Sequence, residues 1–336
     1  MKETCFFILV ALLTVSLAQA QIQTLASEEA TKASAEAVRL FSLKKYDEAF
    51  PFAQKAVEIR ERELGAAHPQ TAQAWRNLGF VQLARNKKDE AAKAFERAIE
   101  GFEKNTNPEK KDSLTLAELL EYLGILRVQQ EKYLSAEKLY ERAVVLRERL
   151  NGSEAKETIG AVWSLGNLKR SNGDFKEAVE LYRRVYENRI KVFGANDNET
   201  YDAFERYRCA LIKKGSKTEA QSLKNDFEIV RNKSRQPSTA AGQILDSGII
   251  NSKAINLVPP PFTSDSRSQR FSGQILTDVI IGEDGKVIHA CAYNDKAPHS
   301  QLTTVEQAAL QSTFKPTTIG GKPVKVIGVI VYNFRQ

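Results

Sequence analysis

The residues of this chain that could perform chemistry are few and lie far apart. Its 336 residues include three histidines, His68, His289 and His299, whose spacing does not suit a shared metal ion. No Gly-x-Ser-x-Gly turn, phosphate-binding glycine loop or Cys-x-x-Cys pair occurs. His68 precedes Pro69 in an expected connection between helices, where a structural role suits it. The sequence therefore predicts no enzyme, no metal site and no cofactor.

Two cysteines, Cys209 and Cys291, lie outside the N-terminal segment. They are 82 residues apart and fall in different predicted domains. An oxidising compartment would allow a disulfide between them, but their spacing does not require one. We expect two separately buried thiols.

Residues 1–20 have the composition of a secretory signal peptide. Lys2 precedes an apolar run from Cys5 to Ala18, and Ala18-Gln19-Ala20 provides the small residues of a cleavage site. The run is shorter than the roughly 20 apolar residues that span a bilayer. We therefore expect cleavage before Gln21 and export, with membrane contact only through an uncleaved N-terminus.

The elements that must position any binding residues begin with a repeat over residues 24–230. Five similar segments end in alanines that lie 42, 45, 42 and 42 residues apart: Ala49, Ala91, Ala136, Ala178 and Ala220. A period of this length indicates stacked supersecondary units, each of which buries its apolar face against its neighbours. Apolar residues at helical spacing on both sides of each alanine predict about five pairs of amphipathic helices.

Small and aromatic residues recur at fixed places within these units. The second unit has Trp75, Leu78, Gly79, Ala91, Phe95 and Ala98; the third has Leu120, Leu123, Gly124, Ala136, Tyr140 and Ala143; the fourth has Val162, Leu165, Gly166, Ala178, Tyr182 and Val185. The pattern resembles the tetratricopeptide repeat, and its period of about 42 is similar to the longer kinesin-light-chain type. The resemblance implies an α-solenoid with a concave groove lined by the first helix of each unit.

Residues that lie off the packing stripe of those first helices are the candidates for the groove wall: Arg76, Phe80, Glu121, Ile125, Trp163, Asn167 and Arg170. An extended or helical peptide would suit such a groove, with Arg76 and Arg170 holding carboxylates. Taken singly, each of the seven could equally be an ordinary solvated residue.

Charge gives no support for nucleic-acid binding. The formal net charge is +7, but 49 basic and 42 acidic residues alternate along the expected helices, which is typical of a solvated surface. No run of basic residues interleaved with aromatic side chains occurs. We expect protein partners instead.

The helical pattern stops near Val230, and residues 231–245 have the polar, proline-containing composition of a linker. Beyond it, residues 274–281 and 286–293 flank a four-residue turn and predict a β-hairpin. Leu302, Val305 and Ala309 predict a short helix, and the β-branched run 324–334 predicts a strand that returns to the hairpin. Residues 246–336 are thus expected to form a small α+β domain with an antiparallel sheet.

Several segments of this domain follow one another in a familiar order: Gly285-Lys286-Val287, Phe314-Lys315-Pro316, Gly321-Lys322-Pro323-Val324 and Val331-Tyr332-Asn333-Phe334. The series is similar to the C-terminal domain of TonB, the energy-transducing protein of Gram-negative envelopes. That resemblance implies binding of a partner strand at the edge of the last strand. The implied edge residues are Val326, Ile327, Val329, Ile330, Val331 and Tyr332; taken singly, each of them could equally belong to an internal strand.

Two functions remain open from the sequence. The first is a periplasmic scaffold that binds peptide or strand segments of protein partners. The second is a TonB-type transport component that contacts outer-membrane receptors. They differ in whether residues 1–20 stay attached, because a transducer needs a retained membrane helix.

Overall fold

The computed structural model describes residues 27–106, 108–233, 245–294 and 296–335. The chain divides into two compact units, Met1–Leu168 and Lys169–Gln336, which we call unit 1 and unit 2. The predicted signal peptide and residues 234–244 of the predicted linker lie outside the described residues. The division falls within α7 (Lys156–Asn172), so the helices that follow α7 share a unit with the C-terminal sheet.

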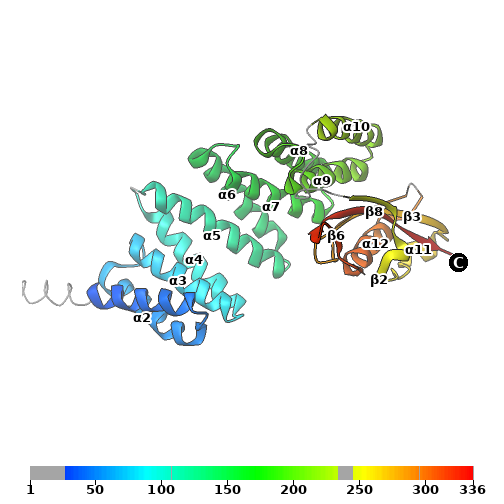
Figure 1. The fold of residues 1–336 in the computed structure, drawn as a ribbon. Helices are drawn as coiled ribbons and strands as arrows, with labels where there is room; N and C mark the ends of the chain where they lie inside the picture. The colour runs from blue at the N-terminus through cyan, green and yellow to red at the C-terminus, as the bar shows by residue number, and fades with distance from the viewer. Residues whose placement is uncertain (1–26, 107, 234–244, 295, 336) are drawn as a thin grey trace, which may run out of the picture. The chain divides into compact units, whose positions relative to one another are not determined.

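Unit 1 consists of helices that pair in sequence order (Figure 1). Residues 27–42 are helical and precede α2 (Tyr46–Leu64), α3 (Pro69–Ala84), α4 (Lys88–Lys104), α5 (Lys110–Gln129), α6 (Tyr133–Asn151) and most of α7 (Lys156–Asn172). α3 packs on α4 and α5 packs on α6. The predicted helix pairs are confirmed here.

In the second and third helix pairs the repeated glycine makes room for an aromatic ring. A Cβ atom added to Gly79 would lie 2.5 Å from Cδ1 of Phe95, and one added to Gly124 would lie 2.6 Å from Cε1 of Tyr140. Such separations are too short for carbon atoms, so only glycine fits without a shift of the neighbouring helix. The Leu-Gly pair at a fixed place in the repeat is thus explained by side-chain packing.

The turn inside each helix pair has the same backbone form in all five repeats. One residue per turn has a positive φ: Lys44 (59°), Asn86 (60°), Glu131 (59°), Gly173 (86°) and Gly215 (94°). These positions follow the same spacing as the repeat alanines. Lysine and glutamate rarely adopt this left-handed conformation, so the surrounding helix packing must hold it in place.

Unit 2 contains the end of α7, then α8 (Phe175–Phe193), α9 (Asn198–Lys214) and α10 (Lys217–Lys233), followed by a sheet. The sheet has the order β1-β8-β3-β4, with β1 (Leu245–Ile249), β8 (Val326–Phe334), β3 (Gly273–Ile281) and β4 (Val287–Tyr293). β3 is antiparallel to both neighbours, but β1 is parallel to β8, so the sheet is mixed and the expectation of a wholly antiparallel sheet is wrong. The predicted hairpin is β3–β4.

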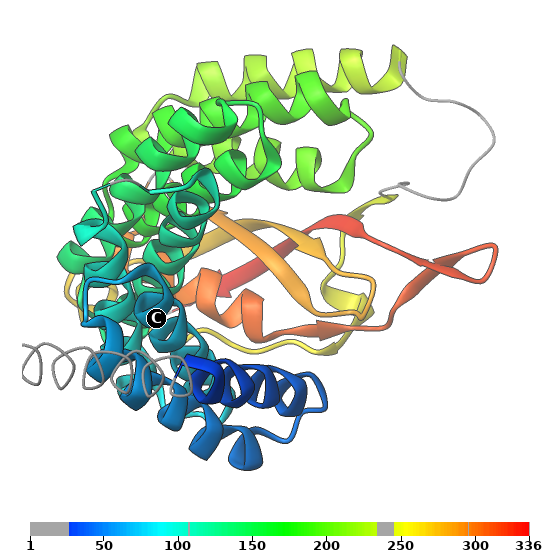
Figure 2. The ribbon, with the colours of Figure 1, turned by 90° about the vertical axis from the view of Figure 1, so that its left-hand side faces the viewer.

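Shorter elements connect these strands. They are η1 (Asn251–Lys253), β2 (Ala254–Asn256), α11 (Ser264–Ser268), α12 (His299–Gln311), β5 (Thr313–Phe314), β6 (Thr317–Ile319) and β7 (Lys322–Val324). α12 is the helix expected from Leu302, Val305 and Ala309, and it covers one face of the sheet. In Figure 2 the sheet lies between α12 and the green helices of the same unit.

The predicted strand-pairing edge is wrong, because β8 is an inner strand. β3 pairs with the full length of β8 on one side, while β1 pairs with Val326, Ile327 and Val329 on the other. The Asn251 side chain donates to the Val331 carbonyl and accepts from the Val331 N–H, at 2.8 Å each. Of the remaining candidates, Ile330 and Tyr332 are buried.

Candidate functional site

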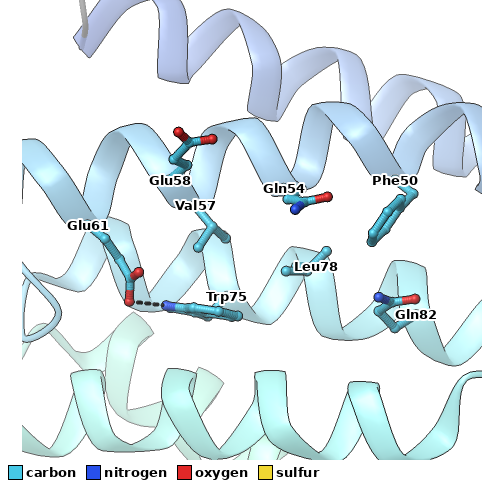
Figure 3. Close-up of a pocket in the computed structure, with 8 residues that line it drawn as sticks. All are labelled: Phe50, Gln54, Val57, Glu58, Glu61, Trp75, Leu78 and Gln82. Atoms are coloured by element: carbon cyan, nitrogen blue, oxygen red, sulfur yellow. Dashed lines mark hydrogen bonds between the residues drawn. The ribbon is translucent and has the colours of Figure 1, made fainter.

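A hollow of about 380 Å³ opens in unit 1 between α2 and α3 (Figure 3). α2 contributes five lining residues and α3 contributes three: Phe50, Gln54, Val57, Glu58 and Glu61, then Trp75, Leu78 and Gln82. The spacing of three or four residues along each helix places these side chains on facing sides. The volume is within the range of about 300–1,000 Å³ that is usual for ligand sites.

Trp75 forms the base of the hollow at one end. Its Nε1–H donates to Oε1 of Glu61 at 2.9 Å, as Figure 3 shows, so the indole is held in one orientation. Val57 and Leu78 are buried beneath the opening and give it an apolar base. Glu58 is exposed and lies one turn before Glu61 on α2, and its carboxylate points away from Trp75 in Figure 3.

A guanidinium group lies next to the other end of the hollow. The Arg85 guanidinium lies over the Phe50 ring at 4.3 Å from its centroid. Arg85 also donates to Oδ1 of Asp47 at 2.7 Å and to Oε1 of Gln82 at 3.1 Å. The hollow therefore has an acidic end and an end that borders a guanidinium.

Two of the predicted groove residues, Arg76 and Phe80, lie together on α3. Arg76 donates to Oε2 of Glu118 on α5 at 2.9 Å, and its guanidinium lies 4.8 Å from the Phe80 ring centroid. Phe80 meets Tyr122 edge-on at 4.9 Å. Arg76 thus already holds a carboxylate of its own chain, although both groups remain partly exposed.

Two more of these residues lie on α5. Glu121 accepts from Nε of Arg147 at 2.8 Å, and burial raises the pKa of the Glu121 carboxyl although Arg147 opposes the shift. Ile125 is 44% exposed. Trp163 and Asn167 lie further along unit 1 on α7. The structure therefore brings four predicted groove residues together on α3 and α5.

Arg170, the remaining candidate, belongs to unit 2. Burial raises the pKa of Tyr182, and interactions of its hydroxyl with Arg206 and Arg170 oppose that shift. Arg170 thus faces a buried phenol. Its predicted role as a carboxylate holder beside Arg76 gains no support from this placement.

The sheet face that α12 does not cover packs against α9 within unit 2. Ile280 joins a buried cluster with Tyr201, Phe204 and Phe227. Beside this cluster, Arg208 on α9 bonds Oε2 of Glu205 at 2.8 Å and Oδ2 of Asp278 on β3 at 2.5 Å.

The charged groups of Arg208, Glu205 and Asp278 stabilise one another. Burial alone would lower the pKa of Arg208, but Glu205 and Asp278 raise it above its ordinary value. Tyr293 donates to Oδ1 of Asp278 at 3.3 Å, and burial together with this carboxylate raises the Tyr293 pKa to about 12. Such a buried network loses stability when one partner is removed.

Further ion pairs flank the contact between α9 and the sheet. Lys213 lies 2.8 Å from Oε1 of Glu306 on α12, and this oxygen accepts from the Ala292 N–H at 2.9 Å. Lys325 donates to Oδ2 of Asp202 at 2.9 Å. The sheet is therefore docked on the last repeat by apolar contacts and by charges.

A disulfide links Cys209 of α9 to Cys291 of β4, with the Cα atoms 5.8 Å apart. The expectation of two separate thiols is wrong, because the docking brings both buried sulfurs to the same contact. Glu306 lies near both cysteines in a group that resembles a metal site by distance. The disulfide uses both sulfurs, so no thiolate is available to a metal ion.

The histidines do not form a site within the described residues. His68 caps α3, where its Nδ1 accepts from the Gln70 N–H at 3.2 Å; the predicted structural role is confirmed. His299 meets the Phe175 ring edge-on at 5.6 Å. His289 is buried, and burial together with Arg206, Arg170 and Arg208 keeps its pKa well below the ordinary value of 6.5.

The sequence reasoning missed the hollow between α2 and α3 and the docked sheet face. Trp75 was assigned to the packing stripe, and its partner Glu61 has no distinguishing context in the sequence. For the docked face a signal existed: Arg208 occupies the place of the repeat glycine, next to Cys209.

Comparison with known proteins identifies the helical part. Residues 27–104 and 115–191 match the family model of the tetratricopeptide repeat. The clustered mitochondria protein homologs of Aspergillus terreus and Candida albicans are 25% identical over 155 residues and 26% identical over 156 residues. Each match covers 46% of this chain, and the chain spans only 12% and 11% of the length of these relatives.

Solved structures with helical repeats are also similar. A putative kinesin light chain of Podosopora anserina with nearly identical repeats is 20% identical, with a TM-score of 0.49, over 62% of this chain and 97% of that one. BtubC of P. vanneervenii is 17% identical, with a TM-score of 0.43, over 62% and 92%. Among the described helices, none combines the length and hydrophobicity needed to cross a bilayer.

Proposed function

We propose that this chain is a protein–protein interaction scaffold whose unit 1 binds a peptide segment of a partner. Residues 27–104 and 115–191 carry tetratricopeptide repeats. The observation that supports this most is the hollow between α2 and α3. It is lined by a partly exposed, oriented indole, by the buried apolar side chains of Val57 and Leu78, and by polar groups. Peptide side chains suit such a mixed and open surface.

We also propose that the scaffold acts in the periplasm or an equivalent oxidising compartment. The predicted signal peptide and the Cys209–Cys291 disulfide support this location independently, since cytosolic thiols are usually kept reduced. Sequencing the N-terminus of the protein from envelope fractions tests it. A start at Gln21 is expected, and a protein that retains Met1 in the cytosol would contradict the proposal.

The role of the sheet follows from how it is bound to α9. We propose that it caps the last repeat, in place of the strand-pairing role that the TonB resemblance implied. Contact with an outer-membrane receptor through β8 would require β1 and the Asn251 side chain to leave that strand. The transport role is therefore the second candidate, and it predicts that a partner strand displaces β1.

Peptide binding by unit 1 can be tested with the full processed chain. A displayed library of random dodecapeptides is selected on the wild-type protein, and the enriched peptides are measured against two variants. Gln54→Trp fills the hollow with a large side chain, so binding should weaken at least tenfold. Lys55→Trp places the same ring on the neighbouring exposed position and should change binding less than twofold.

Two results would overturn the proposed function. One is that no peptide is enriched on a correctly folded protein. The other is that both tryptophan variants bind the enriched peptides as the wild type does, because binding would then lie elsewhere.

A further inference from the structure

We infer that the hollow between α2 and α3 receives a lysine or arginine side chain of the bound peptide. This inference rests on the proposed peptide-binding function and adds the chemistry of the ligand. It follows from three features of the hollow: the charge of its lining, the fixed indole and the position of Arg85.

The ionisable groups that line the hollow are both acidic. They are Glu58 and Glu61, and the other six lining residues are uncharged. Glu61 uses Oε1 to hold the Trp75 N–H, which leaves its second oxygen for a ligand. Glu58 is exposed and lies three residues earlier on α2.

Nearby cations do not cancel this charge. Arg60 and Arg62 flank Glu61 in sequence; Arg60 donates to the Gln70 carbonyl at 3.0 Å, and Arg62 donates to Oε1 of Glu63 at 2.8 Å. Lys55 pairs with Glu29 at 2.7 Å. Glu58, Glu61 and Glu63 therefore outnumber the two guanidinium groups of Arg60 and Arg62 on this stretch of α2, and a ligand cation would meet an excess of negative charge.

The apolar part of the hollow suits the stem of a long basic side chain. Val57 and Leu78 can cover the methylene groups, which lysine and arginine bury while the charged end stays in water. Trp75 is partly exposed next to the Glu61 carboxylate, and tryptophan is the most favourable aromatic residue for a cation. Because Glu61 fixes the indole, little freedom is lost when the ligand binds.

Arg85 sets the direction of the ligand. Its guanidinium pairs with Asp47 and already occupies a face of the Phe50 ring, so that face is not open to a second cation. The charged group of the ligand must therefore point to the end formed by Glu58 and Glu61. An acidic or phosphorylated side chain would be repelled from that end, and an uncharged aliphatic one would lose the ionic contacts.

The peptides selected on the wild-type protein give the first test. They should be enriched in lysine or arginine, and replacing that residue by norleucine should weaken binding about fivefold at low salt. Two exposed ionic contacts correspond to a loss of this order. The loss should shrink as the ionic strength rises from 20 to 500 mM, because salt screens exposed charges.

Charge-removing variants give the second test. In Glu58→Gln the difference between the lysine and norleucine peptides should fall to about twofold. Glu90→Gln alters the net charge of the protein equally at an exposed position of α4 outside the hollow, and it should leave the difference unchanged. Comparing the affinities of the lysine and norleucine peptides for Glu58→Gln and for Glu90→Gln separates the ionic contact with Glu58 from the effect of net charge.

The outcomes separate the two proposals. If peptides bind and Gln54→Trp abolishes binding, but norleucine replaces lysine without loss, then the inference is wrong and the proposed function stands. Enrichment of acidic peptides would overturn the inference in the same way. If no peptide binds, both fail.

Discussion

The second repeat in unit 1 and the last repeat in unit 2 share one plan but differ in what their first helix meets. In α3, Gly79 accommodates the Phe95 ring of its own pair, and the surface towards α2 stays open as a hollow. In α9, Arg208 stands in the glycine position and reaches Asp278 of the sheet. The residue at this helix position therefore allows internal packing in the second repeat, and in the last repeat it docks the sheet.

A second position changes together with the glycine. The ring that needs the space lies four residues after the repeat alanine: Phe95, Tyr140 and Tyr182 follow Ala91, Ala136 and Ala178. After Ala220 the equivalent residue is Lys224, which is exposed and lies 3.9 Å from Glu228. Without a ring to accommodate, the last repeat does not need glycine, and arginine becomes available for docking.

The largest effect should come from removing the covalent link in unit 2. Cys209→Ser should destabilise unit 2 by up to about 4.5 kcal/mol, the loop-closure value for a loop of this length. Both tryptophans, Trp75 and Trp163, lie in unit 1, so tryptophan fluorescence reports that unit alone. The urea unfolding transition measured by circular dichroism should move to a lower urea concentration, while the transition measured by tryptophan fluorescence should not move.

Wild-type protein with added reductant is the matched control for Cys209→Ser. It should reproduce the variant's unfolding curve. Equal curves for oxidised wild type and Cys209→Ser would show that the disulfide does not stabilise the docking.

The next effect concerns packing in unit 1. Gly79→Ala places a Cβ atom against the Phe95 ring and should cost about 1–3 kcal/mol of unfolding free energy. Gly160→Ala adds the same methyl group to α7 where no atom lies within 4 Å, and it should be neutral or stabilising by up to about 1 kcal/mol. Thermal unfolding monitored by tryptophan fluorescence compares the two, and equal shifts would refute the packing argument.

The pH dependence should differ between the units because His289 is buried in unit 2. Its pKa lies well below 6.5 in the folded chain, so protonation below pH 6.5 favours the unfolded chain. This histidine should cost unit 2 about 1 kcal/mol between pH 6.5 and 5.5. In urea titrations at the two pH values, His289→Gln should lose about 1 kcal/mol less unfolding free energy than the wild type when the pH falls. An equal loss in both proteins would show that His289 is not the cause.

The smallest effect should come from the repeat turns. Glu131→Gly relieves a left-handed conformation at φ 59° and should stabilise unit 1 by about 0.5–1 kcal/mol. Gly173 and Gly215 already use glycine at the equivalent turns, so no gain is expected there. Glu137→Gly, six residues further on within α6, should instead destabilise the protein in the same thermal assay.

The parts of the fold that depend on local pattern could be predicted from the sequence. Alanine and glycine spacing was sufficient for the helix pairs, and the turn at Gly285 was sufficient for the β3–β4 hairpin. From α2 to α6, from α8 to α10, and in the β3–β4 hairpin, each element contacts the one that follows it in the chain. Their sequence signals therefore repeat within a short stretch.

The parts that depend on distant pairing could not be predicted. β1 has five residues without regular alternation and includes Gly248, so its parallel pairing with β8 has no local signal. The disulfide and the contact between Arg208 and Asp278 join residues 82 and 70 positions apart. The arginine in a glycine position was the local indication that something other than a ring packs there.

The disulfide also determines how the chain would respond to a mechanical pull. A force applied between the N- and C-termini passes through the bond from Cys209 to Cys291 and bypasses the 82 positions between them. At about 3.4 Å per residue, roughly 280 Å of chain length would stay hidden until the bond is reduced. In an optical trap this appears as a shorter total extension for the oxidised protein, with α10, β1 and β3 shielded from the load.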